Sequence, residues 1–125
     1  MPYTYWKNTK QLEMMMNRLN NVDGSDLGCV IDGSHIAAHE LDFRIIRLAY
    51  ENGYDVDYFQ LLNDMEMYDE LPYEEIADIN EGLWEECSLA IDWMNSQLPD
   101  HYYFYVDDGS LYLTYEDEEG TEYNL

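Results

Sequence analysis

Apolar residues recur at helical spacing in four segments of the chain. Each segment repeats them every three or four residues, which is typical of an amphipathic helix with one buried face. Turn-forming residues separate the segments, and Gly53 is expected to end the second one in the left-handed conformation. The pattern predicts helices over residues 8–20, residues 37–52, a short stretch that begins at Asp55 or Asp57 and includes Met65, and a long stretch from Pro72 to Leu98.

The last of these helices has unusual residues near its start and in its interior. Pro72 suits the first turn of a helix, where its missing N–H is not needed. Asn80 and Gly82 lie further inside, and both are weak helix formers. The sequence therefore leaves open one helix to Leu98, a helix kinked at these two residues, or a division of the segment into two helices.

Shorter apolar runs, bounded by turn residues, predict strands. One covers residues 27–31, and two more, residues 101–106 and 111–115, flank the turn sequence Asp-Asp-Gly-Ser, a strong hairpin signal. Residues 121–124 are a candidate edge strand. We expect a single domain, residues 1–125, of the α+β class, with about four helices packed on a small antiparallel sheet and a C-terminal β-hairpin.

Composition adds a strong charge to this picture. The chain carries 28 acidic residues against 5 lysines and arginines, a formal net charge of −23. Its 46% hydrophobic residues are enough to bury a core, unlike those of a disordered acidic chain. Direct binding to nucleic acid or to an anionic membrane is excluded, because both need a positive surface. With no membrane-spanning run and no secretory signal, we expect a cytoplasmic protein.

Groups suited to catalysis are few. His35 and His39 are four residues apart, a spacing that would place two imidazoles on one helix face and suggests a small metal-dependent enzyme as an alternative. Glu40 follows the second histidine, so the His-Glu-x-x-His order of metalloproteases is absent. Cys29 and Cys87 both lie in apolar patterns and are expected to be core thiols. We therefore expect no catalytic residue, no metal and no cofactor.

The long helix carries a row of carboxylates opposite its apolar stripe. Their spacings of 4, 3, 4 and 7 residues keep them in one line, roughly 27 Å long at about 1.5 Å per residue. A row of this length matches the phosphates of about eight base pairs. The row consists of Glu74, Asp78, Glu81, Glu85 and Asp92.

The excess of acidic over basic residues continues on both sides of this helix. Residues 48–125 hold 22 acidic residues and no lysine or arginine, so this stretch of the chain supplies no counterions of its own. We infer a partner protein that supplies them through a basic groove, most simply one built for nucleic acid. Further candidate partner-binding residues are Asp64, Glu66, Asp69, Glu70, Asp107, Asp108, Glu116, Asp117, Glu118 and Glu119.

In small size, extreme acidity, few lysines and many tyrosines, the chain resembles the DNA-mimic inhibitors encoded by phages and mobile elements. These are anti-CRISPR and anti-restriction proteins, and the resemblance is one of character, without a shared motif. It implies a protein that blocks the DNA groove of a CRISPR effector or restriction nuclease in an infected bacterial host. A homodimer is compatible with the sequence.

Other interpretations of the acidity remain open at this point. An immunity protein that neutralises a basic nuclease toxin would need the same charge complementarity. An acidic adaptor without an inhibitory role would also present carboxylates to a partner. A halophilic protein would carry an acidic surface throughout, whereas the first 47 residues here are almost balanced in charge.

Overall fold

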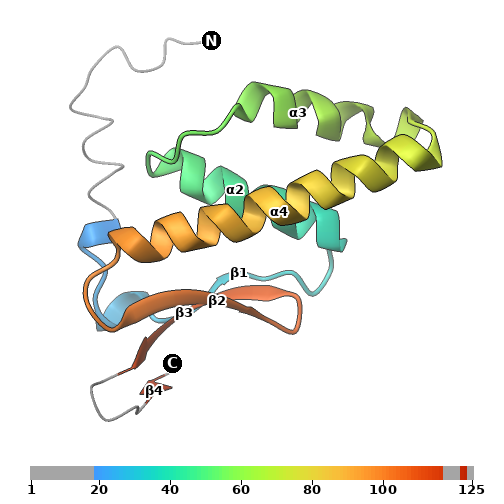
Figure 1. Cartoon of the computed structure of the whole chain (residues 1–125). Coiled ribbons are helices and arrows are strands. Elements are labelled where there is room, and N and C mark those ends of the chain that lie inside the picture. The colour runs from blue at the N-terminus through green and yellow to red at the C-terminus, as the bar shows by residue number, and fades with distance from the viewer. Residues whose placement is uncertain (1–18, 117–121, 124–125) are drawn as a thin grey trace.

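Three α-helices and a small antiparallel sheet make up the computed structural model, which describes residues 19–116 and 122–123 (Figure 1). The predicted α+β class is confirmed. This described part holds three helices where about four were expected, because all but the last two residues of the predicted helix 8–20 lie outside it. In chain order the elements are η1 (Gly24–Asp26), β1 (Gly28–Ile31), α2 (Ala38–Glu51), α3 (Tyr58–Met67), η2 (Tyr68–Glu70), α4 (Tyr73–Gln97), β2 (Tyr102–Asp107), β3 (Ser110–Glu116) and β4 (Glu122–Tyr123).

Strand β3 lies at the centre of the sheet. It pairs along its length with β2, and it pairs with β1 and with β4 as well, always antiparallel. Helices α2 and α4 cover one face of the sheet, and α3 lies beyond them (Figure 1). The register opposes Phe104 to Leu113, both buried, so these positions face the helices.

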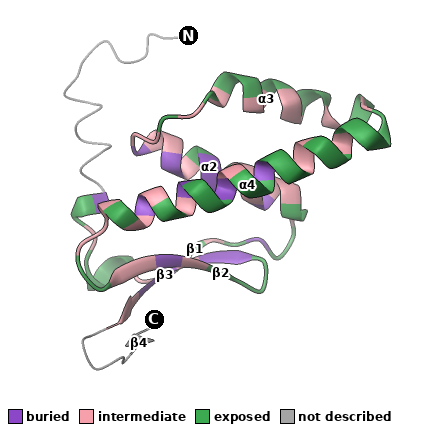
Figure 2. Ribbon diagram, in the orientation of Figure 1, coloured by how far each residue is buried: buried purple, intermediate pink, exposed green. Residues whose placement is uncertain are grey.

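The core fills the space between the sheet and the two helices next to it, as the buried positions in Figure 2 show. Burial of apolar surface is the main force that holds these layers together, and it contributes about 25 cal/mol per Å². The large apolar side chains that are fully buried in the core come from α2, α4 and β3. They are Ile45, Ile46, Leu83, Met94, Leu111 and Leu113.

Local signals in the sequence place the helix ends well. Asp57 caps α3, with its carboxylate accepting a hydrogen bond from the Gln60 backbone N–H at 3.1 Å. Gly53 follows α2 with φ 109°, as expected for a glycine stop. Pro72 immediately precedes α4, one position earlier than predicted.

Helix α4 is continuous over 25 residues, so of the alternatives that the sequence left open, the division into two helices is excluded. The side chain of Asn80 accepts a hydrogen bond from the Tyr68 hydroxyl at 2.8 Å, which ties the first half of α4 to η2. Tertiary contacts of this kind outweigh the weak helix propensity of Asn80 and Gly82, which together amounts to about 1–2 kcal/mol.

The predicted hairpin is confirmed between β2 and β3. Its two central residues, Asp108 and Gly109, have φ of 51° and 76°, the left-handed values that a two-residue turn of the primed type requires. Gly33 packs directly against this turn, because a Cβ at residue 33 would lie 1.8 Å from the Gly109 carbonyl oxygen. The Gly33 N–H also donates to Ser110 Oγ at 3.0 Å, so the loop after β1 is held against the hairpin.

Candidate partner-binding surface

One side of α4 exposes the carboxylates that the helical spacing placed in a row. The opposite side carries buried residues such as Leu83, Cys87 and Met94, so the predicted amphipathic arrangement is confirmed. We call the row the acidic line. Its members, all exposed, are Glu74, Asp78, Glu81, Glu85 and Asp92.

The basic residues of the described chain are Arg44 and Arg47, and both are already paired. Arg44 contacts Glu40 at 2.8 Å and Arg47 contacts Glu51 at 3.4 Å, each pair one turn apart on α2. No other ion pair forms between described residues. The acidic line therefore has no ion-pair partner among the described residues.

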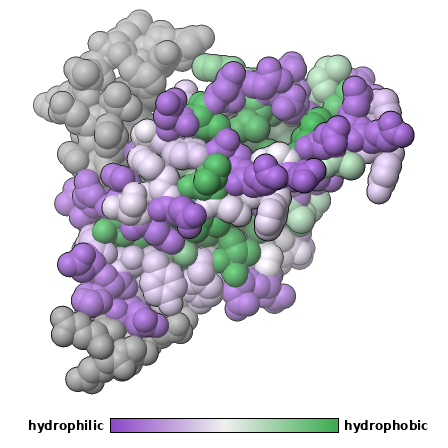
Figure 3. Space-filling view, viewed as in Figure 1, coloured by the Kyte–Doolittle hydropathy of each residue, from purple (hydrophilic) through white to green (hydrophobic). Residues whose placement is uncertain are grey.

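Other predicted acidic residues extend this charge around α4. Figure 3 shows hydrophilic side chains spread over α3 and α4, with hydrophobic ones between them. Asp92, Val106 and Gly109 line one groove, which brings the C-terminal part of the acidic line close to the hairpin turn. The predicted partner-binding residues outside the line that are exposed are Glu66, Asp69, Glu70, Asp107 and Asp108.

The structure does not gather every predicted acidic residue into this surface. Asp64 is partly buried and accepts a hydrogen bond from Gln60 Nε2 at 2.9 Å. Glu116 lies at the opposite end of β3 from the hairpin turn, roughly 20 Å away at about 3.3 Å per residue. Asp117, Glu118 and Glu119 lie outside the described residues.

The predicted pairing of His35 and His39 on one helix face is wrong. His35 lies exposed in the turn before α2, which begins at Ala38. His39 is on the helix, but its ring stacks on Tyr68 with the ring centroids 4.0 Å apart. Among the described residues, no group of three or more histidine, cysteine, aspartate or glutamate side chains is arranged to hold a metal ion.

The two cysteines have different environments. Cys87 is buried, as predicted, and burial together with the neighbouring Asp42 carboxylate raises the pKa of its thiol to about 12. A thiol with this pKa is a poor nucleophile at neutral pH. Cys29 is exposed, so its predicted core position is wrong. It pairs with Tyr112 on β3, whose neighbours Leu111 and Leu113 are the residues that face the core.

The Glu86 side chain on α4 is held by a hydrogen bond that the sequence pattern did not predict. The Tyr54 hydroxyl, from the loop after α2, donates to the Glu86 carboxylate. Burial and this carboxylate raise the pKa of Tyr54 to about 12. Because the two residues are 32 positions apart, only the packing of α2 against α4 brings them together.

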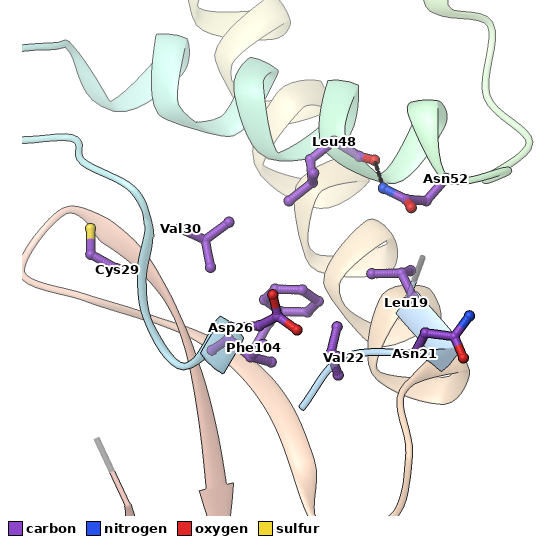
Figure 4. A pocket seen from close by; sticks show the side chains of 10 residues that line it. Leu19, Asn21, Val22, Asp26, Cys29, Val30, Leu48, Asn52 and Phe104 are labelled. Carbon is purple, nitrogen blue, oxygen red and sulfur yellow. Dashed lines mark hydrogen bonds between the residues drawn. The ribbon is translucent and has the colours of Figure 1, made fainter. Parts of the chain in front are cut away.

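A largely apolar pocket of about 690 Å³ lies between η1, α2 and the sheet (Figure 4). Leu48, Val30 and Phe104 line it, together with the polar side chains of Asp26 and Asn52. Asn52 is 1% exposed, and its Nδ2 donates to the Leu48 carbonyl oxygen at 2.8 Å. Its Oδ1 has no hydrogen-bond partner among the described residues. None of the acidic residues predicted to bind a partner lines this pocket.

A second cavity lies between α4, the start of α2 and the β2–β3 hairpin. We call it the hairpin groove; its volume is about 820 Å³. Trp84 and Asp92 from α4, Asp42 from α2 and Val106 from β2 contribute to its lining. Sequence periodicity identified only Asp92, because the other three residues carry no pattern of their own.

Comparison with known protein families, curated proteins and solved structures found no match to this chain. Among the described helices, none combines the length and the apolar character needed to cross a membrane.

Proposed function

We propose that this protein is an inhibitory binding protein that mimics DNA. Its carboxylate surface occupies the nucleic-acid groove of a host defence nuclease, a CRISPR effector or a restriction enzyme, and excludes DNA from it. The context that this implies is a protein encoded by a phage or mobile element, acting in the cytoplasm of the infected host. The protein itself performs no catalysis in this role.

The observation that carries the proposal is the acidic line, which has no ion-pair partner in the part of the chain that the structure describes. Both arginines of the described chain pair within α2, so they do not neutralise α4. Five exposed carboxylates lie along about 27 Å of helix. The first four are one helical turn apart, about 5–6 Å, and Asp92 follows Glu85 after two turns. A groove lined with lysine and arginine is the natural complement of such a row, and binding releases the counterions of both surfaces.

Like charges at this density cost stability in the free protein, because they repel one another in the folded state. An acidic face that served solubility alone would gain from interspersed lysines, which form stabilising pairs of about 0.3–0.5 kcal/mol on helices. The described part of residues 48–125 has no lysine or arginine at all. This pattern favours a surface used for binding over one that is merely hydrated.

Displacement of labelled duplex DNA from purified CRISPR effectors and restriction nucleases tests the proposal. We expect the protein to compete with DNA for at least one of these enzymes, and its potency to fall steeply as salt rises. The triple reversal Asp78→Lys, Glu81→Lys and Glu85→Lys is expected to weaken competition by about 100-fold or more, because like charges brought together in an interface cost several kcal/mol.

A matched variant makes the same change in charge away from the acidic line. Asp26, Asp55 and Asp100 are exposed and lie outside the proposed surface, so their reversal to lysine is expected to have a much smaller effect. Equal losses in both triple variants would show that total charge acts without a located surface. Full competition by the first variant would remove the acidic line from the binding site.

A further inference from the structure

The hairpin groove combines an exposed aromatic ring with carboxylates. Trp84 is 64% exposed, although tryptophan is among the largest apolar side chains. It lies two turns before Asp92 on α4, and both residues line the groove. Exposed tryptophans of this kind are typical anchors of protein interfaces, where they contribute a large share of the binding energy.

Asp42 contributes a second carboxylate from another element. It lies near the start of α2, is partly buried, and lines the same groove. The Cys87 thiol is its hydrogen-bonding neighbour, and it takes part in neither ion pair of the described chain. A partly buried carboxylate costs free energy when it is charged, and a cation placed beside it recovers that cost.

Apolar side chains complete the lining of the groove. Val106 on β2 is 44% exposed, and Ile91 on α4 lies between the two helices and the hairpin. The groove is therefore apolar in its walls and negative at two positions. A ligand that suits it has an apolar stem and a cationic head.

We propose that the hairpin groove binds an arginine-bearing segment of the partner protein, with the guanidinium held between the Trp84 indole and the carboxylates of Asp42 and Asp92. The inference rests on the proposed function, because it names the group that the basic partner inserts beside the acidic line. The volume of about 820 Å³ exceeds that of one side chain, so residues next to the arginine enter as well.

Arginine fits this lining better than lysine. Its planar guanidinium stacks on an indole and forms paired hydrogen bonds with a carboxylate, whereas the lysine ammonium is a strongly hydrated point charge. A second copy of this chain is a poor occupant, because each copy brings a net charge of −23.

Calorimetric titration of the full chain with oligoarginine and oligolysine peptides of equal length tests the groove. We expect the oligoarginine to bind more tightly at the same salt concentration. Trp84→Ala is expected to weaken oligoarginine binding by about fivefold, the loss of one cation–π contact, and to leave oligolysine binding almost unchanged. Asp42→Asn is expected to weaken oligoarginine binding by about tenfold.

Two variants on α4 serve as controls outside the groove. Leu89 is 58% exposed, and Leu89→Ala removes a comparable apolar surface without touching the lining of the groove. Glu75→Gln removes one exposed carboxylate from the same helix. Both variants are expected to keep the preference for arginine over lysine.

The outcomes separate this inference from the proposed function. Equal affinity for both peptides, unchanged by Trp84→Ala, would overturn the arginine site and leave the DNA-mimic proposal intact, since that proposal needs only charge. A preference for oligoarginine that depends on Trp84 and Asp42 would support the arginine site in the hairpin groove. This would hold even if the protein displaced DNA from none of the nucleases tested. Self-association that Trp84→Ala abolishes would instead identify a second copy as the occupant and contradict the inference.

Discussion

At the scale of single residues, Asp42 and Cys87 show how packing changes ordinary side chains. Burial raises the pKa of Asp42 above its usual 3.8, and the hydrogen bond from the Cys87 thiol offsets only part of that rise. The same contact contributes to the high pKa of the thiol. Each group of the pair therefore holds its proton more tightly than it would in water.

The raised pKa of Asp42 predicts a specific pH dependence. The folded state holds the Asp42 proton more tightly than the unfolded state, so this group destabilises the fold as pH rises from about 3.8 through the higher folded pKa. Asp42→Asn abolishes this effect, and urea unfolding is expected to show the variant gaining stability relative to wild type over that pH range, with the gain retained at pH 7.

Removing any acidic residue also relieves general repulsion, so a control is needed. Asp92→Asn removes the same charge from an exposed position and measures that contribution. The gain from Asp42→Asn is expected to exceed it at pH 7. Equal gains would show that burial of Asp42 has no energetic consequence of its own. Together with weaker arginine binding, a larger gain would mean that Asp42 serves binding at the expense of stability.

At the scale of elements, α4 is held to the rest of the molecule at several points along its length. Near its C-terminus, Asn95 bonds the backbone of Phe104 twice: Oδ1 accepts from the N–H at 2.6 Å, and Nδ2 donates to the carbonyl at 3.3 Å. Near its N-terminus, Asn80 bonds Tyr68. These contacts explain how one uninterrupted helix carries the acidic line.

Two open glycines are expected to respond oppositely to the same added methyl group. A Cβ at Gly82, inside α4, and one at Gly109, in the hairpin turn, would both meet no atom within 4 Å. Gly82→Ala is expected to stabilise the protein by about 0.5–1 kcal/mol, because alanine loses less backbone entropy in a helix. Gly109→Ala is expected to destabilise it by about 1–2 kcal/mol, because φ at this residue is 76°.

The midpoint of urea unfolding measures both changes, and each variant serves as the control for the other. Stabilisation by both variants would mean that the positive φ of Gly109 relaxes without cost. Destabilisation by Gly82→Ala would indicate that α4 bends at this position in the folded protein, as the sequence had suggested.

At the scale of the whole molecule, repulsion among the acidic residues is the dominant electrostatic effect. The net charge is −23, and the ion pairs of the described chain lie on the exposed side of α2. Exposed pairs of this type contribute at most about 1 kcal/mol each. Salt therefore reduces the repulsion among the acidic residues by more than it reduces the attraction within the two ion pairs.

Added sodium chloride is accordingly expected to raise the Tm of the free protein, while it weakens binding to a basic partner. The Debye length falls from about 30 Å at 0.01 M to about 10 Å at 0.1 M, so most of the rise should occur in this range. Differential scanning calorimetry across that range measures it. The triple lysine variant of the acidic line is expected to show a smaller rise, and a Tm that falls with salt would contradict the dominance of repulsion.

The sequence alone determined features that depend on neighbours within a few residues. Helical periodicity assigned the buried and exposed sides of α4, because a rotation of about 100° per residue is a local property. The turn at Asp108 and Gly109 was predictable for the same reason. For the start of α3 the sequence offered Asp55 or Asp57, and the structure shows the cap at Asp57. The acidic line could therefore be predicted from the sequence alone.

Only the tertiary structure decided which residues from different elements meet. Cys29 is exposed because it lies on the outward side of a strand whose pairing no local pattern specifies, and Tyr54 reaches Glu86 across 32 residues. The hairpin groove arises in the same way, because Asp42, Trp84 and Val106 belong to three separate elements. Charge along a helix is set by sequence spacing, whereas a groove exists only once layers have packed.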